Sequence, residues 1–189
     1  MSSFTVLYDA CVLYPASIRD LLIELARTGL FRAKWTARIH SEWIDAVLRE
    51  RSDLSRPQLE HVARLMDRAV LDCVVTDFET LEPGFALPDP NDNHILAAAI
   101  HCGAQEIVTF NLKDFPEQSL RPYGIQAIHP DQFVGHLFDL NDEAVCEAVR
   151  RIRRRLTKPA RSALEIIETY ERNGLAVSAS SLRGRVNSL

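Results

Sequence analysis

Four acidic side chains and one amide stand at positions where predicted strands and helices begin or end. Asp9 directly follows an apolar stretch, Glu42 borders the apolar stripe of a predicted helix, and Asp92 lies in the first turn of another helix. Asn111 and Asp114 follow a further buried stretch. Carboxylates that converge without basic partners repel one another unless a divalent cation neutralises them, and oxygen ligands suit Mg²⁺ or Mn²⁺. Such ions orient a phosphodiester and lower the pKa of water, so the set predicts hydrolysis of phosphodiester bonds.

Several of these residues also have an ordinary structural explanation. Asp89 precedes Pro90 and is expected to be the N-cap of the helix that follows. Asp92 could be a surface acid favoured by the helix dipole, and Asn111 and Asp114 could be turn residues. Their joint placement with an acid directly after the first strand is what favours a metal site.

The elements that would position these residues alternate along the first two thirds of the chain. Apolar stretches predict strands at residues 4–8, 31–35, 71–75, 106–110 and 125–128. Apolar residues at helical spacing predict helices at residues 18–28, 37–49, 57–69 and 90–102 between them. This alternation predicts an α/β fold with a central parallel sheet and helices on both faces. Parallel strands place their carboxyl ends at one edge, where ligands of such folds bind.

The pattern changes to helices alone beyond about residue 130. Helices are expected over residues 130–138, 142–156 and 160–172, with a last short one after Ser178. We therefore divide the chain into an α/β domain, residues 1–135, and a C-terminal helical extension, residues 136–189.

Composition is typical of a globular protein of the cytoplasm. The 189 residues are 47% hydrophobic and 25% charged, with a net charge of −4. Four cysteines stand without metal-ligand spacing, as expected for free thiols in a reducing compartment. No signal peptide and no apolar run of membrane-spanning length is visible. A glycine-rich phosphate loop is also absent from the sequence, which excludes the usual nucleotide-binding motifs.

A dense basic run lies in the predicted helical extension. It consists of Arg150, Arg151, Arg153, Arg154, Arg155, Lys158 and Arg161. On a continuous helix, Arg150, Arg154 and Lys158 would share one face and could follow the phosphates of a nucleic acid. A solvated face, a dimer surface or a site for an acidic protein partner would explain the run equally well.

Four segments resemble, in order, the successive motifs of PIN-domain ribonucleases. They read VLYDACVL, SEWIDAVL, DPNDNHILAAAI and IVTFNLKDF, within residues 4–135. Among these ribonucleases the chain is most similar to the toxin subunits of VapBC-type toxin–antitoxin pairs. The resemblance implies an α/β/α sandwich and metal-binding catalytic acids at Asp9, Glu42, Asp92 and Asp114, with Asn111, Thr109 and Asp89 in support.

The resemblance further implies a Mg²⁺- or Mn²⁺-dependent endoribonuclease that acts as a toxin, forms a homodimer and is inhibited by a cognate antitoxin. Two positions depart from the family pattern, because Cys11 stands where Asn or Ser is common and Asn111 where an acid is frequent. The alternatives are a housekeeping PIN-type nuclease of RNA processing or DNA repair, and a catalytically weak protein that binds nucleic acid or a partner. For the basic run, binding of nucleic acid or a partner is expected at Arg150, Arg151, Arg154, Arg155 and Lys158.

Overall fold

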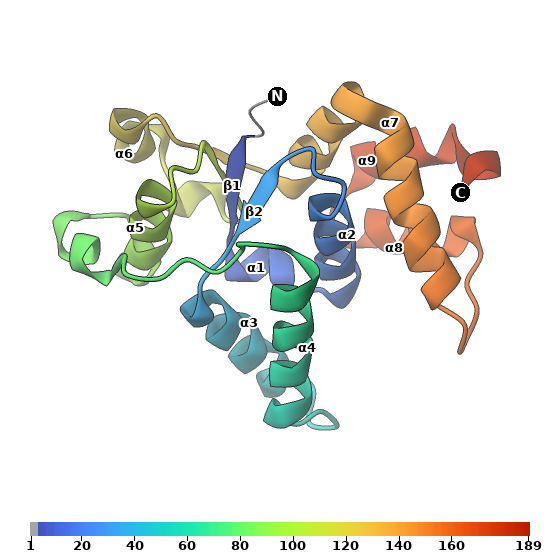
Figure 1. The fold of residues 1–189 in the computed structure, drawn as a ribbon, viewed down its shortest axis with the longest axis horizontal. Coiled ribbons are helices and arrows are strands. Elements are labelled where there is room, and N and C mark those ends of the chain that lie inside the picture. The colour runs from blue at the N-terminus through green and yellow to red at the C-terminus, as the bar shows by residue number, and fades with distance from the viewer. Residues whose placement is uncertain (1–3) are drawn as a thin grey trace.

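A four-stranded parallel sheet forms the centre of the computed structural model, which describes residues 4–189 (Figure 1). The strands are β1 (Thr5–Tyr8), β2 (Arg32–Lys34), β3 (Glu106–Val108) and β4 (Gln126–Ile128). Their order is β2-β1-β3-β4, so β1 pairs on both sides and is buried throughout. The predicted parallel α/β fold is therefore confirmed.

Helices cover the sheet on both sides, with α5 and α6 on one side and α2 and α7 on the other (Figure 1). The helices of the first part are α1 (Ala10–Leu13), α2 (Ala16–Ala26), α3 (Ala37–Glu50), α4 (Arg56–Ala69), α5 (Asn93–His101) and α6 (Glu117–Leu120). The last part holds α7 (Pro130–Arg155), α8 (Ala163–Arg172) and α9 (Ala176–Arg183). Short 3₁₀ turns include η1 (Glu79–Gly84), η2 (Pro90–Asp92) and η3 (Leu112–Asp114).

Local sequence signals fix the starts of several helices. The Thr36 hydroxyl accepts a hydrogen bond from the Ile39 amide at 3.1 Å and caps α3. The amide of Ser55 donates to the Gln58 side chain at 2.8 Å, one half of the capping box that opens α4. Pro130 occupies the first turn of α7, where its missing N–H costs no helical hydrogen bond.

The predicted strand at residues 71–75 was wrong. Within residues 4–189, a single parallel bridge, between Trp35 and Val74, joins this segment to the sheet. Asp72 has a φ of 53°, which breaks the extended backbone that strand pairing needs.

The C-terminal helices follow the prediction in one place and differ from it in another. The predicted break between residues 138 and 142 is present as a kink at Asn141, whose φ and ψ of −163° and 90° are non-helical and which divides α7 into two parts. The Asn141 side chain accepts a hydrogen bond from the Ala144 amide at 3.0 Å, so it caps the second half of α7. The third helix begins at Ala163 because Ser162 and Glu165 form a capping box there.

Two buried carboxylates join the C-terminal helices to the rest of the chain. Asp131, in the first turn of α7, accepts hydrogen bonds from the amides of Val177 and Ser178 at 2.9 and 2.8 Å and so holds the start of α9. Glu24 of α2 is 1% exposed and pairs with Arg155 at the end of α7. Across residues 4–189, every helix is too short or too polar to cross a lipid bilayer.

Candidate active site at the carboxyl ends of β1 and β3

The register between β1 and β3 brings Asp9 beside Thr109. Tyr8 pairs with Val108, and the Asp9 amide donates to the Val108 carbonyl at 3.1 Å. Asp9 and Thr109, which follow Tyr8 and Val108, therefore lie side by side, and the Thr109 hydroxyl donates to Oδ2 of Asp9 at 2.7 Å. Asp9 is 6% exposed, so its carboxylate is held in one orientation at the sheet edge.

Cys11 supplies a second donor to the same oxygen. Its Sγ lies 3.0 Å from Oδ2 of Asp9 and accepts a hydrogen bond from the Phe110 amide at 3.2 Å. Burial and the neighbouring Asp9 charge raise the pKa of the Cys11 thiol, which keeps the S–H available as a donor. A thiol thus occupies the place of the usual Asn or Ser and contacts the same carboxylate. Both hydrogen bonds end on Oδ2, and Oδ1 has no donor within residues 4–189.

An open pocket of about 380 Å³ joins Asp9 to three other expected site residues. Glu42 enters it from α3, Asp92 from η2 and Asn111 from the turn after β3. Its wall is completed by Ala10, Cys11, Tyr14, Trp43, Ala46, Arg49 and Glu50. Asp114, in η3, does not line this pocket. No three His, Cys, Asp or Glu side chains in the described part of the chain are already close enough together to hold an ion.

Several acidic side chains surround Asp92. Its pKa is raised from 3.8 to about 7, first because the carboxyl is partly buried and then because Asp9, Asp89 and Asp114 lie near it. Asp114 therefore acts on the pocket through its charge, although it is not in the wall. In the described residues, no Lys or Arg forms an ion pair with Asp9, Asp92 or Asp114.

Glu42 differs from the other acids because it has basic neighbours. Oε1 of Glu42 lies 2.9 Å from Nε2 of His94 and 3.4 Å from Nε of Arg38. His94 is fully buried, and its ring nitrogens make no aligned hydrogen bond within residues 4–189. Arg38 also donates to Glu82 at 3.1 Å, which ties α3 to η1. These contacts were not predicted from the sequence, although Arg38 stands four residues before Glu42, a spacing that brings helical side chains together.

Asp89 has the capping geometry expected from the sequence. Its side chain accepts a hydrogen bond from the Asn91 amide at 2.9 Å and caps η2, with Pro90 in the first position. Asp92 ends this turn and begins α5, where it makes no capping hydrogen bond. The cap and the pocket acid are therefore two different residues, three positions apart.

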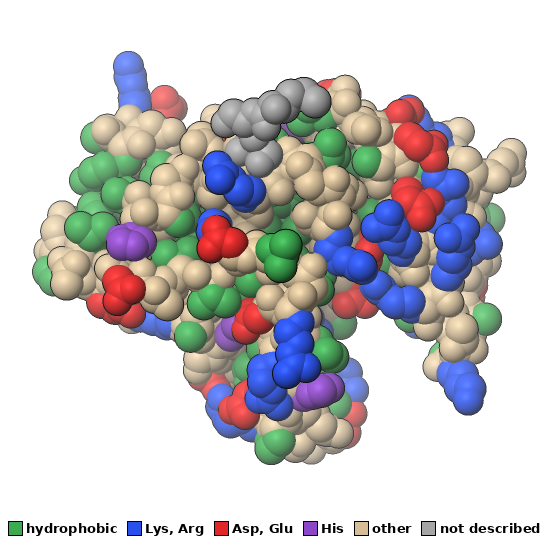
Figure 2. Space-filling model, in the orientation of Figure 1, with side chains coloured by type: hydrophobic (Ala, Val, Ile, Leu, Met, Phe, Trp, Pro, Cys, Tyr) green, Lys and Arg blue, Asp and Glu red, His purple; other side chains and the backbone are tan. Residues whose placement is uncertain are grey.

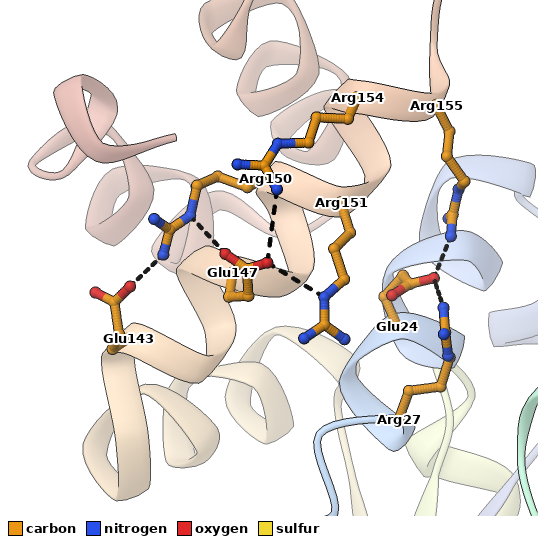
Figure 3. Close-up of polar contacts among 8 residues, drawn as sticks. All are labelled: Glu24, Arg27, Glu143, Glu147, Arg150, Arg151, Arg154 and Arg155. Atoms are coloured by element: carbon orange, nitrogen blue, oxygen red, sulfur yellow. Dashed lines mark hydrogen bonds and ion pairs between the residues drawn. The ribbon is translucent and has the colours of Figure 1, made fainter.

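The arginines of the basic run have different acidic partners. Arg150, Arg151 and Arg154 approach Glu147, whereas Arg155 points to Glu24 on α2 (Figure 3). The expected shared face with Lys158 was wrong because α7 ends at Arg155. Pro159 disfavours helical backbone at the residue before it, so Lys158 lies in the following loop.

Comparison with known proteins agrees with the resemblance seen in the motifs. A family model described as PIN domain matches residues 5–113, and one described as VapC50 C-terminal domain matches residues 130–184. The "Putative ribonuclease VapC50" of Mycobacterium tuberculosis (strain ATCC 25618 / H37Rv) is 53% identical over 53 residues. This alignment covers 28% of the present chain and 31% of that protein. No solved structure matches the chain. Because the PIN match covers more than half of the chain, the chain belongs to the PIN-domain family, and its C-terminal part resembles that of VapC-type members.

Proposed function

We propose that this protein is a metal-dependent endoribonuclease that hydrolyses phosphodiester bonds of RNA. The observation that carries the proposal is the group of carboxylates around Asp92, which has a pKa of about 7 beside Asp9, Asp89 and Asp114. Burial is the largest cause of this raised pKa, and repulsion from the neighbouring carboxylates adds to it. A divalent cation would offset that repulsion. Membership of the PIN family and the printed name of the M. tuberculosis relative support RNA as the substrate.

The donor set of the pocket fits Mg²⁺ or Mn²⁺. Asp9, Asp92 and the nearby Asp114 offer carboxylate oxygens, and these hard ligands suit Mg²⁺ and Mn²⁺. Glu42 would join the set as a fourth acid, in exchange for its contacts with His94 and Arg38. These side chains would have to rotate toward one another, since they do not yet converge. Such an ion would supply Lewis-acid polarisation of a phosphoryl oxygen and lower the pKa of water.

The residues of the chain then have separate tasks. Thr109 and Cys11 fix Oδ2 of Asp9 and leave Oδ1 for ligation. Asn111 adds an amide at the pocket wall, and Arg49 adds a positive charge that would hold a phosphate of the RNA.

We further infer a role as the toxin of a VapBC-type pair, with a cognate antitoxin as partner and a homodimer as the assembled form. The match of residues 130–184 to the VapC50 C-terminal domain supports this assignment. It also supports the division into a nuclease domain, residues 1–135, and an extension, residues 136–189. Expression of the chain alone is expected to arrest growth, and co-expression of the small neighbouring gene is expected to relieve the arrest. Unimpaired growth with the chain alone would argue against a toxin.

Metal binding can be tested without any RNA. Isothermal titration of the protein with MnCl₂ is expected to show saturable binding for the wild type and none for Asp9→Asn or Asp92→Asn. Glu168→Gln is a matched control, because it removes one exposed carboxylate of α8 and should bind as the wild type does. Equal Mn²⁺ affinity of all four proteins would refute the assignment of the site.

A further inference from the structure

Lys and Arg side chains gather over the region of α7, with acidic side chains among them (Figure 2). Arg150, Arg151 and Arg154 form what we call the arginine surface, and Glu147 lies between them (Figure 3). The four residues recur at i, i+3, i+4 and i+7 and therefore follow one stripe of the helix.

Glu147 organises this surface. Its carboxylate lies 3.0 Å from Nε of Arg150, 3.3 Å from Nε of Arg151 and 3.9 Å from Nη1 of Arg154. Arg150 is also engaged by Glu143, whereas the terminal nitrogens of Arg151 point away from Glu147 (Figure 3). The side chains of Arg151 and Arg154 are 41% and 70% exposed. Glu147 thus orients Arg151 and only attracts Arg154 by its charge, and both guanidinium groups are exposed to a ligand.

The charges do not balance on this surface. Three guanidinium groups face the carboxylates of Glu147 and Glu143, and the more exposed groups are those with the longer contacts. Arg155 belongs to a different arrangement, since it pairs with the buried Glu24, which Arg27 also contacts at 2.7 Å (Figure 3). The basic run therefore has two roles: Arg151 and Arg154 are available to a ligand, and Arg155 connects α7 to α2.

The chemistry of the surface favours phosphates over an acidic polypeptide. A protein partner usually needs a buried aromatic or aliphatic anchor at the centre of its interface. The four residues of the stripe include no apolar side chain. The exposed Leu140 and Leu164 lie outside it, before the kink of α7 and on α8, so the stripe itself offers no such anchor. Planar guanidinium groups bind phosphate oxygens in pairs, and by the helical rise Arg151 and Arg154 lie about 4.5 Å apart along the axis.

We propose that the arginine surface binds the sugar-phosphate backbone of RNA at a site separate from the acidic pocket. The identity of the RNA as substrate rests on the proposed nuclease function, but its binding here does not require cleavage. Arg151 and Arg154 make the phosphate contacts, Glu147 positions them, and Arg155 takes no part.

Binding can be measured in an Asp9→Asn background with EDTA, so that the RNA stays intact. The probe is a fluorescein-labelled 20-nucleotide oligouridylate, followed by anisotropy between 50 and 200 mM KCl. Each lost phosphate contact lowers the slope of log Kobs against log[salt] by about 0.7 for a single strand. Arg151→Gln with Arg154→Gln is therefore expected to reduce the slope by about 1.4. The matched control is Arg64→Gln with Arg68→Gln, two exposed arginines of α4 with the same loss of charge.

The outcomes separate this proposal from the alternatives. An unchanged slope in the double variant, or an equal reduction in the control, would overturn it. Loss of binding to a labelled polyglutamate with the RNA slope retained would also overturn it and would assign the surface to an acidic protein. Arg155→Gln is expected to keep the slope and to lower the melting temperature, because Glu24 loses one partner. A reduced slope would show that Arg155 also binds RNA and would contradict its purely structural role. RNA cleavage is measured separately, with the protein that retains Asp9. If that protein does not cleave RNA, the salt dependence of RNA binding still tests this proposal.

Discussion

The titration of Asp92 leads to a quantitative prediction for the metal-free protein. Its pKa is 3.8 without perturbation and about 7 in the folded chain. A group whose pKa is raised by folding stabilises the fold when it is protonated, so this contribution is present below about pH 4 and is lost as the pH rises through 7. The full change would correspond to roughly 4 kcal/mol, at about 1.4 kcal/mol per pKa unit. Because Asp92 is partly exposed and solvent screens its charge, we expect about 2 kcal/mol.

Urea unfolding in EDTA at pH 5 and pH 8 measures this contribution. Because the unfolded-state carboxyl, with its pKa of 3.8, is already ionised at pH 5, only about two thirds of this change falls between the two pH values. The free energy of unfolding of the wild type is therefore expected to fall by about 1.3 kcal/mol more than that of Asp92→Asn, whose amide does not titrate. Glu168→Gln should follow the wild type. Mn²⁺ is expected to restore the stability of the wild type at pH 8, since it binds the folded state alone. The same dependence on pH in the wild type and in Asp92→Asn would refute the reasoning.

Two further substitutions test the supports of the site and of the extension. Thr109→Val removes the hydroxyl that donates to Asp9, and it should lower the free energy of unfolding by about 1–3 kcal/mol and weaken Mn²⁺ binding in titration calorimetry. Unchanged Mn²⁺ affinity would show that this hydrogen bond does not prepare Asp9 as a ligand. Asp131→Ala removes the acceptor for the Val177 and Ser178 amides and should lower the free energy of unfolding by about 2–3 kcal/mol, measured by urea denaturation. A loss below 0.5 kcal/mol, on the order of an exposed substitution, would contradict the role of Asp131 in holding α9.

Much of the fold was predictable because local signals and long-range packing agree. Thr36 and Ser55 stand where capping side chains are preferred, and both begin helices in the structure. The apolar stretch before Asp9 is buried on both faces, as a central parallel strand must be. The position of Asp9 at the carboxyl end of β1 follows from this strand.

Other features depend on single backbone conformations or on distant contacts. The positive φ of Asp72 cannot be read from a stretch that is otherwise typical of a strand. Contact between His94 and Glu42 depends on how α3 and α5 pack, because these residues lie far apart in the sequence. The division of the arginines likewise depends on Glu24, more than a hundred residues before them.

The central claim is that the acids around Asp9 form the catalytic metal site of a ribonuclease. The most direct measurement is the cleavage of a single-stranded RNA by the purified wild type and by Asp9→Asn, with and without Mn²⁺. We predict cleavage by the wild type only when Mn²⁺ is present, and no cleavage by Asp9→Asn although its circular dichroism and melting temperature show a folded protein. Cleavage by Asp9→Asn at the wild-type rate would contradict the claim.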